Sequence, residues 1–294
     1  MKSNTKYYLI LFFIFIILFS LFINRSNNKY ESFENKKNAI VVLTRGYENN
    51  NQYQTLIDRN KSIYDIFYSK LKDKSLYDII IFHEGNITRD QEIYIQSQIP
   101  ELPLIFIPIS FIKKEINNPK CPNTELSNSF SNGYKNMCYF WSISFLDYLK
   151  YYNYIIRIDE DCIINKLNPN ILYEYQDNNI MFSSPTYQSD DDPDVIKGLR
   201  ELFDNYLYDN NKIQKNELKM PYTNFMIVNI PFFKNSIDVT NILNQVNKSD
   251  CIFSNRWGDL PIWGYILSYL IDKKYYIEDK NISYMHGSHS NIVN

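Results

Sequence analysis

Short, almost continuously apolar segments that alternate with helical patterns constrain the fold of this chain most. Segments of this kind, rich in β-branched residues, are typical of strands buried on both faces of a sheet. Between them, apolar residues recur at helical spacing, as in residues 52–71. The segments that we interpret as strands are residues 39–43, 77–82, 104–109 and 154–158. This alternation predicts an α/β domain over residues 38–294, with a mostly parallel central sheet and helices on both faces.

The later part of the chain continues the alternation. Shorter apolar segments predict further strands, and periodic segments between them predict further helices. The expected strands are residues 180–183, 224–233 and 274–277, and the expected helices are residues 137–149, 193–208 and 259–270.

The strand at 154–158 runs directly into two carboxylates, Asp159 and Asp161. On an extended backbone, residues i and i+2 point to the same side, so we expect the two groups to converge beyond the strand end. Ligands of parallel sheets bind beyond the carboxyl ends of the strands, and Arg45 follows the first strand, so it should face the same crevice. Such a carboxylate pair can hold a divalent cation together with nucleotide phosphates. The alternative is that both carboxylates only solvate a turn.

Residues 7–23 form an almost purely apolar run. The run is at the lower edge of the about 17–25 residues that span a bilayer. Lys2 and Lys6 precede it, and no small-residue cleavage site follows it. The pattern predicts a cytosolic tail over residues 1–6, a transmembrane signal anchor over 7–23 and a polar stem over 24–37. The chain would be a single-pass type II membrane protein whose domain faces the lumen of the ER or Golgi. A cleaved signal peptide is the alternative.

Charge and cysteine content limit the partners and the compartment. The formal net charge is −2, and no basic face is evident, so a nucleic-acid partner is not expected. No Cys-x-x-Cys spacing occurs, so a structural zinc site is not expected either. A lumen permits disulfides, and the chain contains Cys121, Cys138, Cys162 and Cys251, for which three pairings are open.

Several segments in a fixed order resemble a known family. They are Arg-Ile-Asp-Glu-Asp at residues 157–161, Gly-Tyr-Lys-Asn-Met-Cys-Tyr-Phe at 133–140, Thr-Asn-Phe-Met-Ile at 223–227, Arg-Trp-Gly-Asp-Leu-Pro at 256–261 and Ile-Ser-Tyr-Met-His at 282–286. Their order and spacing are similar to the α-1,2-mannosyltransferases of fungal secretory pathways, glycosyltransferase family 15. That family shows Glu-Pro-Asp, Tyr-x-x-Met-Cys-Arg-Phe, Asn-Phe-Glu, Trp-Gly-Asp-Ala-Pro and Ile-Gly-Tyr-x-His at the corresponding places. The chain resembles a divergent member over roughly residues 38–289.

The resemblance implies a GT-A fold, a nucleotide-sugar donor (GDP-mannose), a Mn²⁺ ion and transfer with retention to a mannoside or protein glycan. By position, it implies metal ligands at Asp159, Asp161 and His286. It implies that Asp259 and Asp161 take part in catalysis, although Asp259 could also only begin a helix. The candidate nucleotide contacts are Arg45, Tyr134, Arg157 and Asp161.

The sequence departs from the family pattern at several positions. The family's Glu in Asn-Phe-Glu is Met226 here, and a thioether cannot serve as its proposed nucleophile. The family's Arg after Met-Cys is Tyr139, and Glu-Pro-Asp has become Asp159-Glu160-Asp161. Either the reaction proceeds by same-face attack assisted by Asp259 or the donor phosphate, or the chain is an inactive glycan- or nucleotide-binding membrane protein. In a further alternative, it is a structural membrane protein whose acidic loops are only solvated.

Overall fold

A seven-stranded sheet organises the part of the chain that the computed structural model describes, which is residues 36–112, 118–189, 192–287 and 289–293. The strands lie in the order β10-β6-β9-β4-β1-β2-β3. Their bounds are β1 (Asn38–Thr44), β2 (Tyr77–His83), β3 (Leu104–Pro108), β4 (Tyr154–Ile158), β6 (Phe182–Ser184), β9 (Phe225–Asn229) and β10 (Tyr276–Glu278).

The sheet is mostly parallel, as predicted. β1 pairs in parallel with β2 and β4, β2 with β3, and β10 with β6. β9 alone in this sheet runs antiparallel to its neighbours, β4 and β6. Its first residue, Phe225, therefore lies opposite Ile158 at the carboxyl end of β4. The preceding residue, Asn224, accepts a backbone hydrogen bond of 2.9 Å from the amide of Asp159, so β9 delivers Asn224 to the edge where ligands of parallel strands bind.

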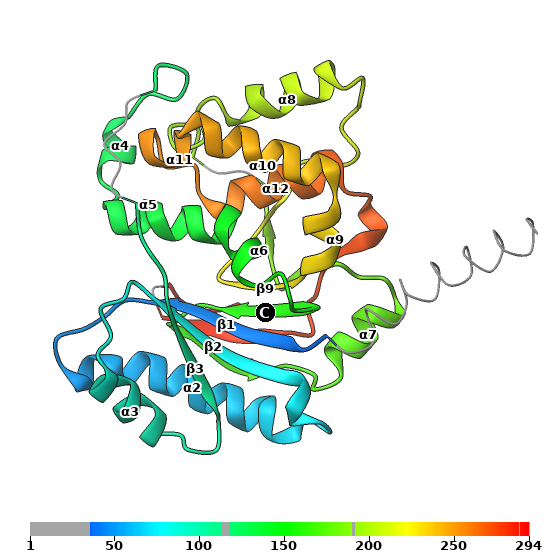
Figure 1. Ribbon diagram of the computed structural model, residues 1–294. Helices are drawn as coiled ribbons and strands as arrows, with labels where there is room; N and C mark the ends of the chain where they lie inside the picture. Colours follow the sequence, from blue (N-terminus) through cyan, green and yellow to red (C-terminus); the bar gives the residue numbers. More distant parts are fainter. Residues whose placement is uncertain (1–35, 113–117, 190–191, 288, 294) are drawn as a thin grey trace, which may run out of the picture. The chain divides into compact units, whose positions relative to one another are not determined.

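Helices cover both faces of the sheet (Figure 1). On one face lie α2 (Gln54–Ile66) and α3 (Arg89–Ser97), and Thr88 and Gln91 form the capping box at the start of α3. A π-helical turn over residues 140–144 joins two helices of the other face, α5 and α6. That face carries α5 (Asn132–Tyr139), α6 (Phe145–Tyr148), α9 (Ile230–Asn235), α10 (Ile237–Ser249) and α12 (Asp259–Leu270). Further helices are α4 (Glu125–Asn128), α7 (Ile171–Asp177), α8 (Leu199–Asp209) and α11 (Cys251–Ser254).

The larger core cluster lies between the sheet and the layer of α5, α6, α10 and α12. Eleven of the residues of α12 are buried, which explains its apolar sequence all round. Trp263 of this helix stacks on Phe182 of β6, with ring centroids 5.7 Å apart. Burial of these large aromatic side chains supplies much of the apolar area that holds the helix layer on the sheet.

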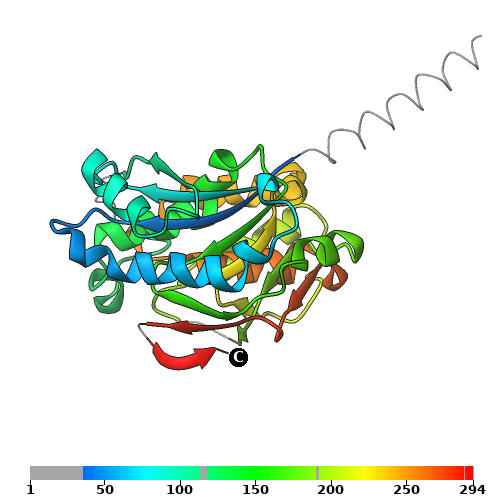
Figure 2. The same ribbon diagram turned by 90° about the horizontal axis from the view of Figure 1, so that it is seen from below.

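A second, three-stranded sheet brings the end of the domain to the acidic segment. It consists of β5 (Cys162–Lys166), β11 (Ser283–His286) and β12 (His289–Val293), in the order β12-β11-β5. β11 runs antiparallel to β5, in a register that sets His286 opposite Cys162. Figure 2, which views the molecule from the side of α2, shows β11 and β12 in red at one edge of the domain. This pairing is why a histidine near the chain end lies beside a turn in the middle of the sequence.

A disulfide joins Cys121, in the loop before α4, to Cys251 at the start of α11. The other two cysteines, Cys138 and Cys162, are buried thiols. The disulfide Cys121–Cys251 belongs to one of the three pairings that the sequence left open, but the second bond of that pairing, Cys138–Cys162, is not formed.

Several boundaries differ from the predicted ones. The helix expected from residue 137 already begins at Asn132, where Ser131 caps it, and the helix expected from 193 begins only at Leu199. The predicted strand over 224–233 ends at Asn229, because the side chain of Asn229 accepts a hydrogen bond from the amide of Phe232 and starts α9. The prediction also lacks several elements of the structure, among them the helices α4, α7, α9, α10 and α11 and the strands β5, β11 and β12.

The predicted tail, the anchor over residues 7–23 and most of the stem lie outside the described residues. Within the described part of the chain, no helix is both long and apolar enough to span a bilayer. The anchor therefore stays a prediction from the sequence.

Candidate active site

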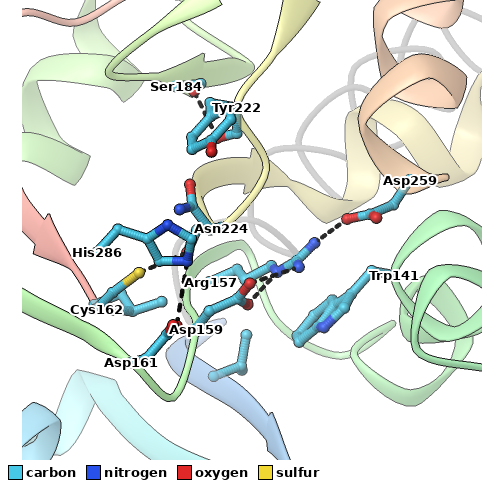
Figure 3. Close-up of polar contacts among 12 residues, drawn as sticks. Trp141, Arg157, Asp159, Asp161, Cys162, Ser184, Tyr222, Asn224, Asp259 and His286 are labelled. Atoms are coloured by element: carbon cyan, nitrogen blue, oxygen red, sulfur yellow. Dashed lines mark hydrogen bonds and ion pairs between the residues drawn. The ribbon is translucent and has the colours of Figure 1, made fainter. Parts of the chain in front are cut away.

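The acidic segment forms a tight turn at the carboxyl end of β4. The backbone amide of Cys162 donates to the carbonyl of Asp159 at 3.1 Å, so residues 159–162 reverse the chain and begin β5. The expectation that Asp159 and Asp161 share one side of an extended strand is wrong, because the backbone is not extended there. In the turn, the two carboxylates have different partners (Figure 3).

Asp159 is held by a buried arginine. Arg157 donates from Nε and Nη2 to the two carboxylate oxygens of Asp159, at 2.8 and 3.0 Å, and from Nη1 to Asp259. The guanidinium also lies over the ring of Trp141, 4.4 Å from the centroid. Burial alone would lower the pKa of Arg157, but the two carboxylates raise it above its ordinary value. The charge is therefore permanent, and this forked geometry fixes the orientation of Asp159.

Asp161 faces His286 instead. Nε2 of His286 lies 3.3 Å from Oδ1 of Asp161, and the histidine side chain is only 12% exposed. Its hydrogen bond to Asp161 raises the pKa of His286 above the usual value. One potential ligand atom from each of Asp161, Cys162 and His286 lies within 4.8 Å of the others. The ring of Tyr222 packs edge-on against the imidazole, with centroids 6.2 Å apart.

These donors fit a divalent cation. Carboxylate and imidazole ligands suit Mn²⁺ and its neighbours in the first transition row, while a thiol such as Cys162 would favour softer ions. Asp159 lies near enough to raise the pKa of His286 through its charge, although Arg157 engages both of its oxygens. The structure thus brings Asp161 and His286 together directly, and ligation by the predicted set of Asp159, Asp161 and His286 stays a prediction.

Asn224 adds a donor that the sequence reasoning missed. Its side-chain oxygen accepts a hydrogen bond of 2.6 Å from the hydroxyl of Tyr284, which orients the amide. The buried Nδ2 has no hydrogen-bond partner among the described residues. Because an unmade buried hydrogen bond is costly, we expect a water molecule or a ligand atom to accept from this donor. Its sequence signal is the segment 223–227, in which Asn224 precedes Met226 by two residues.

A cleft of about 340 Å³ opens beside the acidic turn, where β1, β2 and β4 end and α5 begins. Arg45 and Tyr134, both predicted as nucleotide contacts, line it, and so does Glu160. The hydroxyl of Tyr134 accepts a hydrogen bond of 2.7 Å from Arg256, whose guanidinium lies over the Tyr134 ring. Arg157 does not line the cleft and only 2% of its side chain is exposed, so its position does not support the predicted nucleotide contact.

Met226 lies in an apolar environment beside Arg157. It is fully buried in β9 and lies opposite Arg157 in the antiparallel pair, so both side chains are on the same sheet face. Asp259 comes to that face from the first turn of α12, but its carboxylate is buried and paired with Arg157. The helix cap at this end is Gly258, so capping does not explain Asp259. Trp257 is buried and donates to the carbonyl of Lys197, which makes it part of the packing.

Comparison with known proteins identifies the fold. No family model and no curated protein sequence matches the chain. Among solved structures, core-mannan synthase A from Aspergillus fumigatus, in a Mn/GDP form, is similar with a TM-score of 0.69 at 18% identity, over 86% of this chain and 75% of that one. The mannosyltransferase Ktr4p from S. cerevisiae is similar with a TM-score of 0.70 at 18% identity, over 86% of this chain and 70% of that one.

The fold is that of a glycosyltransferase, with a central, mostly parallel sheet. It is the fold of the fungal mannosyltransferases in particular, which confirms, at the level of the fold, the resemblance that the sequence motifs indicated.

Proposed function

We propose that this protein is a metal-dependent glycosyltransferase that transfers mannose from GDP-mannose to a mannoside or protein glycan, with retention. The observation that carries the proposal is the contact between Asp161 and His286 next to a cleft at the carboxyl ends of the strands. The similar structures support the donor, because one is a Mn/GDP form and another contains GDP.

Each residue of the site has a separate role in the proposed reaction. Asp161 and His286, with Asp159 adjoining, would hold the metal ion, which supplies positive charge to the departing diphosphate. Arg157 keeps Asp159 in one orientation. Arg45 offers a cation to the phosphates and Tyr134 an aromatic face to the nucleoside.

Retention has to proceed without a nucleophile at Met226. We infer same-face attack: the bond from the anomeric carbon to the diphosphate oxygen breaks, and its electron pair leaves with GDP. The acceptor hydroxyl then bonds to the anomeric carbon on the same face and gives its proton to the departing phosphate oxygen. We leave Asp259 out of this proposal, because its buried carboxylate is engaged by Arg157.

The test is Mn²⁺-dependent transfer and hydrolysis by the full chain, with a panel of nucleotide sugars. Turnover with GDP-mannose is expected. If the folded protein turns over none of the nucleotide sugars, the proposal that it is an enzyme is refuted. The second candidate is an inactive nucleotide-binding protein, which the apolar Met226 favours. Binding of GDP with Mn²⁺ but no transfer would support that candidate.

The location in the membrane rests on other observations. We propose that residues 7–23 anchor the chain and that residues 38–294 face a lumen. Lys2 and Lys6 before the apolar run support this orientation, and the disulfide between Cys121 and Cys251 fits an oxidising compartment. Protection of the domain from protease in sealed vesicles tests the orientation, and digestion without detergent would contradict it.

A further inference from the structure

Glu160, the middle residue of the acidic turn, belongs to the cleft and not to the cluster of Asp161 and His286. Its oxygens accept two hydrogen bonds, one of 2.5 Å from Oγ1 of Thr44 and one of 2.8 Å from the hydroxyl of Tyr47. Thr44 ends β1 and is buried. The carboxylate of Glu160 is therefore fixed in the wall of the cleft by groups from another strand end.

Tyr47 is itself held in place. Its amide donates to the hydroxyl of Tyr53 at 2.9 Å, and its carbonyl accepts from Nε2 of Gln91 at 2.7 Å. The rings of Tyr47 and Tyr53 meet edge to face, with centroids 5.0 Å apart. Because an ionised carboxylate has about four acceptor positions, the two bonds from Thr44 and Tyr47 leave acceptor positions on Glu160 for a ligand.

The charge of Glu160 limits what that ligand group can be. Arg45 and Glu84 line the same cleft, and the guanidinium of Arg45 lies 4.9 Å from the centroid of the Tyr47 ring. A carboxylate repels phosphate but attracts paired hydrogen-bond donors. In a nucleotide those donors are the ribose diol, which acidic residues bind in other open α/β sheets, or the N1–H and amino edge of guanine.

We propose that Glu160 determines nucleoside specificity by accepting hydrogen bonds from two neighbouring donors on the nucleotide, with Thr44 and Tyr47 as positioning residues. The inference rests on the proposed function, since it concerns the donor of that same site. The family that the sequence resembles has proline at this position, which cannot supply the contact.

The first test is the affinity for GDP in the presence of Mn²⁺, measured by calorimetry on the full chain. Removing a negative charge near a diphosphate raises the affinity by Coulomb's law alone. Glu84→Gln, which removes the same charge from the same cleft, is therefore expected to bind GDP more tightly. Glu160→Gln is expected to bind at least about tenfold more weakly, as for a lost charged hydrogen bond. Unchanged or tighter binding by Glu160→Gln would overturn the proposal.

The second test uses altered nucleotides to identify the donor pair. IDP lacks the exocyclic amine of guanine, and 2′,3′-dideoxy-GDP lacks the ribose diol. The wild-type protein should bind one of these two nucleotides at least about tenfold more weakly than GDP. In Glu160→Gln, this difference in affinity should shrink below about threefold. The nucleotide that shows the effect names the donor. These ratios are taken within one variant, so a loss of stability does not imitate them.

The failures are distinguishable. If Glu160→Gln lowers the affinity for GDP, IDP and 2′,3′-dideoxy-GDP by the same factor, only the specificity role of Glu160 is overturned. A wild-type protein that binds none of them with Mn²⁺ would overturn the proposed function as well.

Discussion

Arg157 gives the sharpest stability prediction, because it holds two carboxylates while 2% of its side chain is exposed. Arg157→Met keeps the aliphatic stem but leaves Asp259, which has 8% of its side chain exposed, without a cation. Breaking a buried pair from one side costs about 3–5 kcal/mol, since the remaining charge is uncompensated. At about 2–4 °C per kcal/mol for a domain of this size, Tm should fall by about 6–20 °C.

The assay is equilibrium urea unfolding followed by tryptophan fluorescence, to which Trp141 under the guanidinium contributes. The matched control is Asp259→Asn in the Arg157→Met background. It removes the stranded charge and should recover about 1–3 kcal/mol, because the burial cost comes from the charge. If Arg157→Met lowers the free energy of unfolding by less than about 1 kcal/mol, which is the range of an exposed ion pair, this reasoning is refuted. The same holds if the double variant recovers no stability.

Three further predictions follow from single features. Mn²⁺ should raise the Tm of the wild type but not of His286→Ala, and an equal rise in both would exclude the histidine as a ligand. Reducing the disulfide opens a loop of 130 residues, so the free energy of unfolding should fall by up to about 5 kcal/mol, and equal urea midpoints with and without reductant would contradict this. Asn60, Asn86, Asn247 and Asn281 each begin an Asn-x-Ser/Thr glycosylation sequon. In a lumen, mass spectrometry of glycopeptides should find no glycan on the buried Asn60. Glycans should instead occur at the exposed sequon positions Asn86, Asn247 and Asn281.

Elements with a strong local signal were predicted well. The helix expected at residues 259–270 has these bounds in the structure, because Gly258 precedes an acidic first turn and a long apolar run. The first four predicted strands are also present, and Pro108 ends β3, which is an edge strand, where a proline is tolerated. Each of these signals lies within a few residues of the element that it specifies.

The geometry of the site depended on contacts between distant residues and could not be predicted. The turn at Asp159 exists because β5 leaves β4 to pair with β11, and nothing near residue 159 specifies that pairing. The same pairing separates Asp161 from Asp159 and gives it His286 as a partner. The placement of Glu160 could not be predicted for a similar reason, since its donors are Thr44, at the end of β1, and Tyr47, in the segment after it. Its one available signal was a charged residue where the resembled family has proline.

Met226 and Asp259 have to be considered together, because both adjoin Arg157 on one sheet face. Arg157 already serves two carboxylates, so a third one, in Met226→Glu, would be buried without compensation. We expect this variant to lose about 3–5 kcal/mol of stability and its new carboxyl to be protonated, which prevents it from acting as a nucleophile. Met226→Glu combined with Asp259→Asn restores the count of charges around Arg157, and should therefore be more stable than Met226→Glu alone. Any gain of transfer should be found in the double variant. If Met226→Glu alone unfolds at the same urea midpoint as the wild type, the explanation by an uncompensated buried charge is wrong.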